Sequence, residues 1–244
     1  MNQQTTIEKM KSMRLIGMAQ TYHASHQDNL YQDYTLDQFV ALLVDQEWEN
    51  RQNRKTERML RNASFRAAAN VKNVDYTSQR GLDKNMFERL IGLNFIKQHE
   101  NIIITGPTGT GKSYLAQSLG RQACTHLYKT KYYTTSALMD LIQLNKLQGT
   151  YRKFIKILQK IDLLILDDFG LHPFDEIARQ ALMDIVEYKY DQSSIIITSQ
   201  IPINKWHEMI GEGTIADAIL DRLIHSSHRI KLDGESLRKN KKLN

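Results

Sequence analysis

Cysteine and long apolar runs are scarce in this chain of 244 residues. The single cysteine, Cys124, excludes an internal disulfide and is typical of a reducing compartment, so we expect a cytoplasmic protein. No apolar run approaches the roughly 20 residues that a membrane-spanning helix requires. The first six residues are polar and lack the apolar core of a signal peptide. We therefore expect neither a secreted nor a membrane-bound protein.

Proline and glycine are also scarce, above all in the first hundred residues. All three prolines follow residue 100, and Gly17 is the only glycine before Gly81. Because both residue types interrupt regular structure, their absence predicts helices, which we place at about residues 5–25 and 36–62. We expect an all-helical N-terminal domain over residues 1–75 that serves DNA binding or docking.

Capping patterns and apolar spacing support these helices. Thr5 with Glu8, and Thr35 with Gln38, form Thr-x-x-Glu/Gln patterns whose side chains satisfy free N–H groups at a helix start. After Thr35, apolar side chains recur at helical spacing. They are Leu36, Phe39, Val40, Leu43, Val44 and Trp48.

Short runs of branched apolar residues follow residue 85 and alternate with helix-length segments. Continuous apolar runs, in place of alternating apolar and polar residues, are typical of parallel strands that are covered on both faces. Strands that alternate with helices predict a three-layer α/β domain over residues 76–244. The expected strands are 102–105, 132–134, 163–166, 195–198 and 228–232.

A glycine-rich loop follows the first of these strands. It satisfies the pattern G-x-x-x-x-G-K-[ST] between a strand and a helix, which is the context that this motif requires. Its glycines allow backbone N–H groups to turn toward phosphate oxygens, and the following helix adds a favourable dipole. The lysine is suited to the β- and γ-phosphates and the serine to Mg²⁺. A nucleoside triphosphate site is therefore predicted at Gly106, Pro107, Thr108, Gly109, Thr110, Gly111, Lys112 and Ser113.

Two carboxylates end the third strand, at Asp167 and Asp168. Beside a phosphate loop, one carboxylate can hold Mg²⁺ while its neighbour polarises an attacking water. We assign Asp167 to the metal and Asp168 to water activation. An acidic pair at a strand end is otherwise a common solvated feature, and it is the upstream loop that favours the metal site. The next strand ends in Thr198-Ser199-Gln200, either near the γ-phosphate or as a plain polar turn.

Positive charge is concentrated in two segments, although the net charge is only +6. Residues 51–72 hold seven basic side chains and one acid, and residues 129–160 likewise hold seven and one. A row of cations on one helical face can neutralise a row of phosphates, although a solvated helix face is the simpler interpretation. The predicted DNA contacts are Arg51, Arg54, Lys55, Arg58 and Arg61 in the first segment, and Lys153 and Lys156 in the second.

The later motifs, together with the loop and the acidic pair, resemble the AAA+ ATPases and, within them, the IstB-like transposition helper proteins of insertion sequences. The resemblance spans nearly the whole chain and is most specific in four stretches, 198–202, 206–208, 215–223 and 234–238. It implies an AAA+ three-layer core with a parallel sheet, preceded by the small helical domain and without a full C-terminal helical lid.

The resemblance also implies roles for single residues. Gln200, with Ser199 beside it, falls at the position of sensor 1. Arg222 looks like the arginine finger that reaches into a neighbouring subunit's site, and Arg238 looks like a second sensor arginine. Most AAA+ proteins carry Asp-Glu where this chain has Asp167-Asp168, so the shorter acid changes where an attacking water is held.

The function implied is that of an ATPase that uses ATP and Mg²⁺. It would assemble as a homo-oligomer on duplex DNA, remodel that DNA and deliver it to a transposase encoded by the same element. Two alternatives remain open, a helicase loader acting in replication and a small-molecule kinase with the same loop. The kinase is disfavoured because residues 161–227 hold four basic residues against twelve acids, which does not suit an arginine-rich lid.

Overall fold

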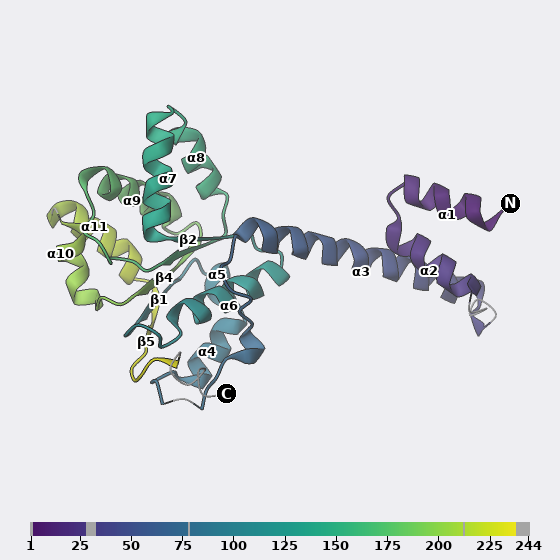
Figure 1. Cartoon of the computed structure of the whole chain (residues 1–244), viewed down its shortest axis with the longest axis horizontal. Coiled ribbons are helices and arrows are strands. Elements are labelled where there is room, and N and C mark those ends of the chain that lie inside the picture. Colours follow the sequence, from purple (N-terminus) through teal and green to yellow (C-terminus); the bar gives the residue numbers. More distant parts are fainter. Residues whose placement is uncertain (1, 28–32, 78, 212, 238–244) are drawn as a thin grey trace. The chain divides into compact units, whose positions relative to one another are not determined.

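The chain forms two compact units, Met1–Arg58 and Met59–Asn244. The structure is a computed structural model that describes residues 2–27, 33–77, 79–211 and 213–237 (Figure 1). The division lies upstream of the boundary expected at residue 75, because residues that follow Arg58 pack on the second unit. The backbone N–H groups of Arg66 and Ala67, for example, donate to Gln117 Oε1 over 2.8 and 2.9 Å.

The first unit contains α1 (Gln3–Ser12), α2 (Ile16–Gln27) and the first part of α3 (Leu36–Ala63). The helix predicted over 36–62 is confirmed. The single helix predicted over 5–25 is wrong, because Arg14 adopts a φ of 60° and this left-handed conformation separates α1 from α2.

The two predicted capping boxes differ in outcome. At Thr35, the backbone N–H donates to Gln38 Oε1 over 2.9 Å, and the N–H of Gln38 donates to Thr35 Oγ1 over 3.3 Å. This box is confirmed. The box at Thr5 is wrong, because α1 begins two residues earlier and is capped by Asn2, whose side chain accepts from the N–H of Gln4.

A buried carboxylate joins α2 to α3 within the first unit. Glu47 Oε2 accepts from the N–H groups of Gly17 and Met18 at the start of α2, over 2.8 and 3.4 Å. Its Oε1 lies 2.7 Å from Arg51 Nε. Burial alone raises the pKa of Glu47, but these hydrogen bonds outweigh it and leave the pKa below its ordinary value. A Cβ atom at Gly17 would lie 2.5 Å from the carbonyl oxygen of Gln46, so only glycine permits this approach.

The second unit is built on a five-stranded parallel sheet in the order β2-β3-β4-β1-β5. All five predicted strands are confirmed. They are β1 (Asn101–Thr105), β2 (Thr130–Thr134), β3 (Leu163–Asp167), β4 (Ser194–Ser199) and β5 (Ser227–Lys231). Because the strands are parallel, the phosphate loop after β1 and the acidic pair at the end of β3 emerge at the same edge of the sheet.

Helices cover both faces of the sheet, which confirms the three-layer α/β prediction (Figure 1). Alternate strand residues serve each face: Ile103 packs with one apolar cluster, and Ile102 and Ile104 with the other. The second cluster includes α4 (Lys84–Ile91), α5 (Asn94–Lys97) and α6 (Lys112–Thr125). The first includes α7 (Thr135–Leu147), α8 (Tyr151–Gln159), α9 (Glu176–Lys189), α10 (Trp206–Ile210) and α11 (Gly213–Ile224).

Two short 3₁₀ helices, η2 (Val71–Asn73) and η3 (Ile203–Lys205), complete the described elements. In the described parts of the chain, every helix is too short or too polar to cross a membrane.

Candidate nucleotide-binding site

The phosphate loop connects β1 to α6, as the motif predicts. Gly109 and Gly111 adopt φ values of 85° and 94°, which residues with a side chain rarely adopt. Space is also lacking, since a Cβ atom at Gly111 would clash with Nη1 of Arg80. Lys112 begins α6 and is buried, with its Nζ donating to the carbonyl oxygens of Gly106 and Pro107 over 2.7 and 2.8 Å. These two hydrogen bonds hold the loop around the ammonium group of Lys112.

Ser113 and Asp167 come together at the edge of the sheet. Ser113 Oγ donates to Asp167 Oδ1 over 2.8 Å. Asp167 is 3% exposed, and Oδ1 also accepts from Thr198 Oγ1 of β4. Its other carboxylate oxygen, Oδ2, accepts from the hydroxyl of Tyr132 on β2 over 2.6 Å. Residues from α6, β2 and β4 therefore converge on one carboxylate at the end of β3.

This pair of residues fits Mg²⁺. A hydroxyl and a carboxylate are hard oxygen donors, and Mg²⁺ is commonly held by one or two protein groups together with substrate phosphates and waters. An all-protein cage is not required, and none of the described ranges contains a group of three or more His, Cys, Asp and Glu side chains suited to a metal.

Asp168 follows directly and is half-buried. Its φ of 57° lies in the left-handed region, which asparagine and aspartate tolerate better than most residues. Its backbone N–H donates to Thr198 Oγ1 over 3.2 Å. The hydroxyl of Thr198 therefore contacts the backbone of Asp168 and the carboxylate of Asp167, to which it donates. This fixed backbone turns Asp168 to line the same cavity as Lys112.

Gln200 and Ser199, the two residues predicted at sensor 1, have different surroundings. Gln200 lines the cavity, and its Oε1 accepts from Thr108 Oγ1 of the phosphate loop over 2.6 Å. Ser199 is fully buried and its Oγ donates to the carbonyl oxygen of Phe169 over 2.6 Å. Its carbonyl oxygen accepts from the N–H of Gly106. Ser199 thus supports the start of the loop, whereas Gln200, not Ser199, lines the cavity.

A cavity of about 930 Å³ opens over the loop. This volume lies within the range of small-molecule sites. Five residues of the predicted loop line it, together with Asp167, Asp168 and Gln200. The remaining lining residues were not predicted: Arg66, Ala67, Asn73, Asp75, Arg80, Tyr114, Gln117, Tyr132, Leu171 and Leu237.

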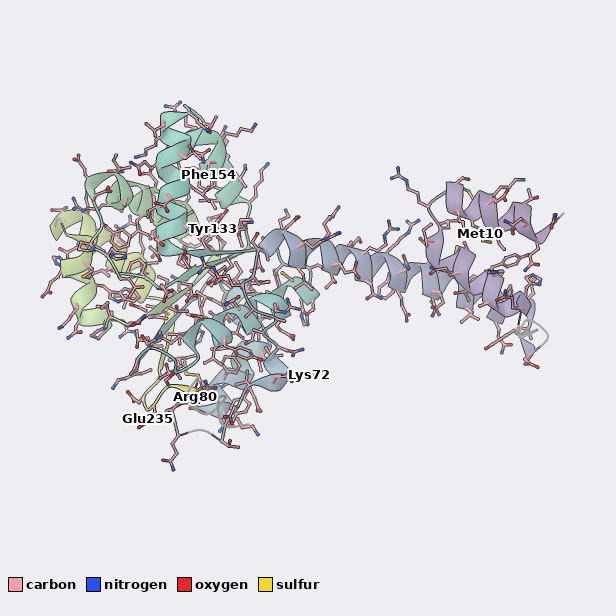
Figure 2. All side chains as sticks on the ribbon, viewed as in Figure 1. Met10, Lys72, Arg80, Tyr133, Phe154 and Glu235 are labelled. Carbon is pink, nitrogen blue, oxygen red and sulfur yellow. The ribbon has the colours of Figure 1, made fainter. Side chains whose placement is uncertain are left out.

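Arg80 is the most prominent of the unpredicted residues. It is 3% exposed, and burial lowers its pKa. Nη1 donates to the carbonyl oxygen of Thr110 and Nη2 to that of Asp75, each over 2.8 Å. Figure 2 shows it beside the C-terminal segment that carries Glu235. A lone arginine in an irregular connector belongs to no sequence motif, so only the tertiary structure reveals its contact with the loop.

Arg222 lies at the opposite end of β1. Its Nε is 2.8 Å from Glu187 Oε2, and its guanidinium stacks over the ring of Tyr190 at 5.8 Å. The carbonyl oxygen of Arg222 accepts from Asn101, the first residue of β1, whereas the loop follows the last residue of that strand. At the usual rise of a strand, about 16 Å separates the two ends. Arg238 lies outside the described residues.

The predicted DNA contacts lie on exposed helix faces. Arg51, Arg54, Lys55, Arg58 and Arg61 are all exposed residues of α3, although Arg51 also pairs with Glu47. On α8, Lys153 and Lys156 are exposed, whereas Ile155 and Leu158 on the other side are buried. Phe154, labelled in Figure 2, packs against the core with Tyr151, whose hydroxyl donates to Asp184 Oδ2 over 2.5 Å. These two aromatic residues are therefore partly buried against the core.

Several insertion sequence proteins are similar to this chain in sequence. The family model described as IstB-like ATP binding protein matches residues 8–244. An insertion sequence ATP-binding protein of Sinorhizobium fredii is 43% identical over 237 residues, which cover 97% of each chain. An IS21 ATP-binding protein of Pseudomonas aeruginosa is 31% identical over 201 residues, covering 82% of this chain and 76% of the relative.

Solved structures share the fold. The DnaC helicase loader has a TM-score of 0.56 at 17% identity, covering 67% of this chain and 96% of that chain. AMPPCP-bound DnaA from Aquifex aeolicus has a TM-score of 0.60 at 22% identity, covering 74% of this chain and 57% of that chain. The chain therefore shares its fold with these two proteins over the parts that are covered.

Proposed function

Because the chain belongs to the IstB-like ATP-binding family, we propose that it is an insertion sequence ATPase that uses ATP and Mg²⁺, assembles on duplex DNA, remodels it and delivers it to a transposase. The observation that carries the nucleotide part is the convergence of Lys112, Ser113 and Asp167 at one edge of the cavity. An ammonium, a hydroxyl and a buried carboxylate are the three groups that a Mg²⁺–triphosphate needs.

In this proposal the phosphate loop binds the nucleotide through its N–H groups, and Lys112 turns from the loop carbonyls to the β- and γ-phosphates. Ser113 and Asp167 would hold Mg²⁺, which would neutralise charge on the phosphate oxygens. Asp168 accepts the proton of a water that attacks the γ-phosphorus, and the bond to the ADP oxygen breaks. Gln200, which already contacts Thr108 of the loop, orients the γ-phosphate.

Arg222 acts from a neighbouring subunit. Its place at the far end of β1 rules out contact with the loop of its own chain, and the pairing with Glu187 and Tyr190 holds it at the surface of α11. An arginine delivered between subunits stabilises transition-state charge and makes hydrolysis depend on assembly.

The exposed cations of α3 and α8 contact the phosphates of duplex DNA. Lysine and arginine bind phosphates without regard to base sequence. Among the relatives, the insertion sequence proteins favour a transposase over a helicase as the protein partner, because the helicase loader shares less than a quarter of its residues with this chain.

ATP hydrolysis with and without duplex DNA tests the enzymatic part. We expect Mg²⁺-dependent hydrolysis that Lys112→Ala abolishes and that Lys205→Ala, an exposed lysine of η3, leaves unchanged. Retention of nucleotide binding by Lys112→Ala would refute the assignment of the phosphate loop.

Salt dependence of DNA affinity tests the DNA part. Each phosphate contact adds about 0.9 to the slope of log affinity against log salt, so the pair Lys153→Gln and Lys156→Gln should lower the slope by about 2. The matched pair Lys84→Gln and Lys97→Gln, exposed lysines of α4 and α5, should not change it. Equal slopes for all three proteins would exclude α8 from the DNA surface. Pull-down against a transposase and a replicative helicase then separates the two partners.

A further inference from the structure

Tyr132 is the one group on β2 that reaches the predicted metal carboxylate. Its hydroxyl donates to Asp167 Oδ2 over 2.6 Å, and the side chain is 4% exposed. The pairing of β2 with β3 places Tyr132 opposite Ile165, two residues before Asp167, so the long phenol side chain spans the distance to the strand end. Tyr132 also lines the cavity over the phosphate loop.

The two carboxylate oxygens of Asp167 accept hydrogen bonds from different residues. Oδ1 accepts from Ser113 and Thr198, and Oδ2 accepts from Tyr132. Without a donor on Oδ2, only the contacts of Oδ1 would limit rotation of the carboxylate about its Cβ–Cγ bond. Hydrogen bonds to ligand groups are what fix such orientations in metal sites. The hydroxyl of tyrosine is protonated at neutral pH, so it acts as a donor to Oδ2.

We propose that Tyr132 is a positioning residue for the Mg²⁺–nucleotide site, which fixes the plane of the Asp167 carboxylate so that Oδ1 faces the metal beside Ser113. This inference rests on the proposed function, because it concerns the same site. It assigns a role in metal binding to a residue of β2, which lies outside both the phosphate loop and the acidic pair.

The neighbouring tyrosine supplies a matched control. Tyr133 lies on the other face of the sheet, where its ring packs with the apolar cluster beneath α7 (Figure 2). Tyr132→Phe and Tyr133→Phe each remove one hydroxyl from adjacent positions of the same strand and keep the ring. Only the first removes a donor from Asp167.

The test is a titration of Mg²⁺ into the full chain with a fluorescent ATP analogue, followed by nucleotide fluorescence. We expect Tyr132→Phe to raise the Mg²⁺ concentration at half-saturation about 10- to 100-fold, the usual effect of losing a group that orients a metal ligand. Binding of the analogue in EDTA should match that of the wild type, and Tyr133→Phe should titrate like the wild type in both conditions.

An unchanged Mg²⁺ midpoint in Tyr132→Phe would overturn the inference and leave the nucleotide site intact. Equal shifts in Tyr132→Phe and Tyr133→Phe would also overturn it, because loss of strand packing would then explain both. If the wild type itself shows no Mg²⁺-dependent binding, the proposed function fails as well. If Tyr132→Phe does not fold, two other variants can be compared: Tyr132→His keeps a ring donor, and Tyr132→Leu does not. The same titration should then give a lower Mg²⁺ midpoint for Tyr132→His than for Tyr132→Leu.

Discussion

Ser113 and Asp167, which are 54 positions apart in the sequence, share a hydrogen bond of 2.8 Å. The first stands in the opening turn of α6 and the second ends β3, with β4 between β3 and the strand that leads to the loop. A metal bound there would link the phosphate loop to the acidic pair.

Removal of the Ser113 hydroxyl should weaken Mg²⁺ binding more than nucleotide binding. In Ser113→Ala the loop N–H groups and Lys112 still hold the phosphates, but one metal donor and one hydrogen bond to Asp167 are lost. We expect about a tenfold higher Mg²⁺ requirement for ATP hydrolysis. Ser118→Ala, a buried serine further along α6, should leave this requirement unchanged.

The carboxylate of Asp168 should be needed for hydrolysis but not for binding. Asp168→Asn removes the proton acceptor and keeps the size of the side chain, so we expect a rate about 10²- to 10⁴-fold lower. The dissociation constant of an ATP analogue, measured by fluorescence, should stay within about threefold, a change worth less than 1 kcal/mol. Full activity in Asp168→Asn would show that another group activates the water.

Active sites formed between subunits should be recoverable by mixing variants. Lys112→Ala lacks a functional loop but keeps Arg222, and Arg222→Ala has the reverse defect. Mixed oligomers should therefore recover part of the ATPase rate, measured at fixed total protein. A mixture of Lys112→Ala with Asp168→Asn is the control, since both defects lie in the same half of the site and cannot complement. Recovery in neither mixture would contradict a role of Arg222 between subunits.

Glu47 should make the first unit sensitive to acid. Its folded pKa is lowered, so its contribution to stability is complete above the unfolded pKa and is lost as the pH falls through the folded pKa. Glu47→Gln should lower the free energy of unfolding at pH 7 by about 1–3 kcal/mol and reduce the loss on acidification. The exposed Glu49→Gln is the control.

Circular dichroism of thermal unfolding between pH 7 and pH 3 measures this effect. A wild-type transition in the first unit that does not move across this range would contradict the assigned hydrogen bonds of Glu47.

Lys189 should also make stability rise with pH, but over a more alkaline range than Glu47. It is 2% exposed, its Nζ donates to the carbonyl oxygen of Ile161 over 2.5 Å, and burial lowers its pKa to about 8 despite the nearby Asp162 charge. Between this value and the higher unfolded pKa, the unfolded state binds the extra proton, so stability rises with pH. Each pKa unit corresponds to about 1.4 kcal/mol, and the increase should total about 1–3 kcal/mol.

Chemical unfolding at pH 7, 8, 9 and 10 tests this sign. Lys189→Met should be more stable than the wild type at pH 7 and should show a flatter pH profile. The exposed Lys205→Met should follow the wild type. A wild-type stability that falls between pH 8 and pH 10 would refute the lowered pKa.

Several parts of the fold follow from local sequence patterns because their physics is local. The apolar runs at Ile102–Ile104 and Ile195–Ile197 require burial on both faces, and parallel strands provide it. The box of Thr35 and Gln38 needs only four consecutive residues. Its counterpart at Thr5 fails because Asn2, an equally good cap, stands nearer the start of the helix.

The residues of the candidate site likewise fall into two groups, those that a local sequence pattern predicts and those that only the tertiary structure reveals. The phosphate loop is contiguous, and glycine spacing together with a lysine and a serine makes it recognisable without a structure. Tyr132, Thr198 and Arg80 reach Asp167 or the loop from three other parts of the chain. Of these, only Thr198 carried a signal, as part of the polar group that ends its strand.

The sequence by itself determined the class of this protein, its sheet and the residues of the phosphate loop, because each depends on neighbours within a few positions. The tertiary structure decided which side chains surround Asp167 and that Arg222 faces away from its own loop. Those relationships depend on strand order and register. Strand pairing joins residues that are far apart in the chain, and hydrogen bonds between side chains then depend on which face each residue occupies.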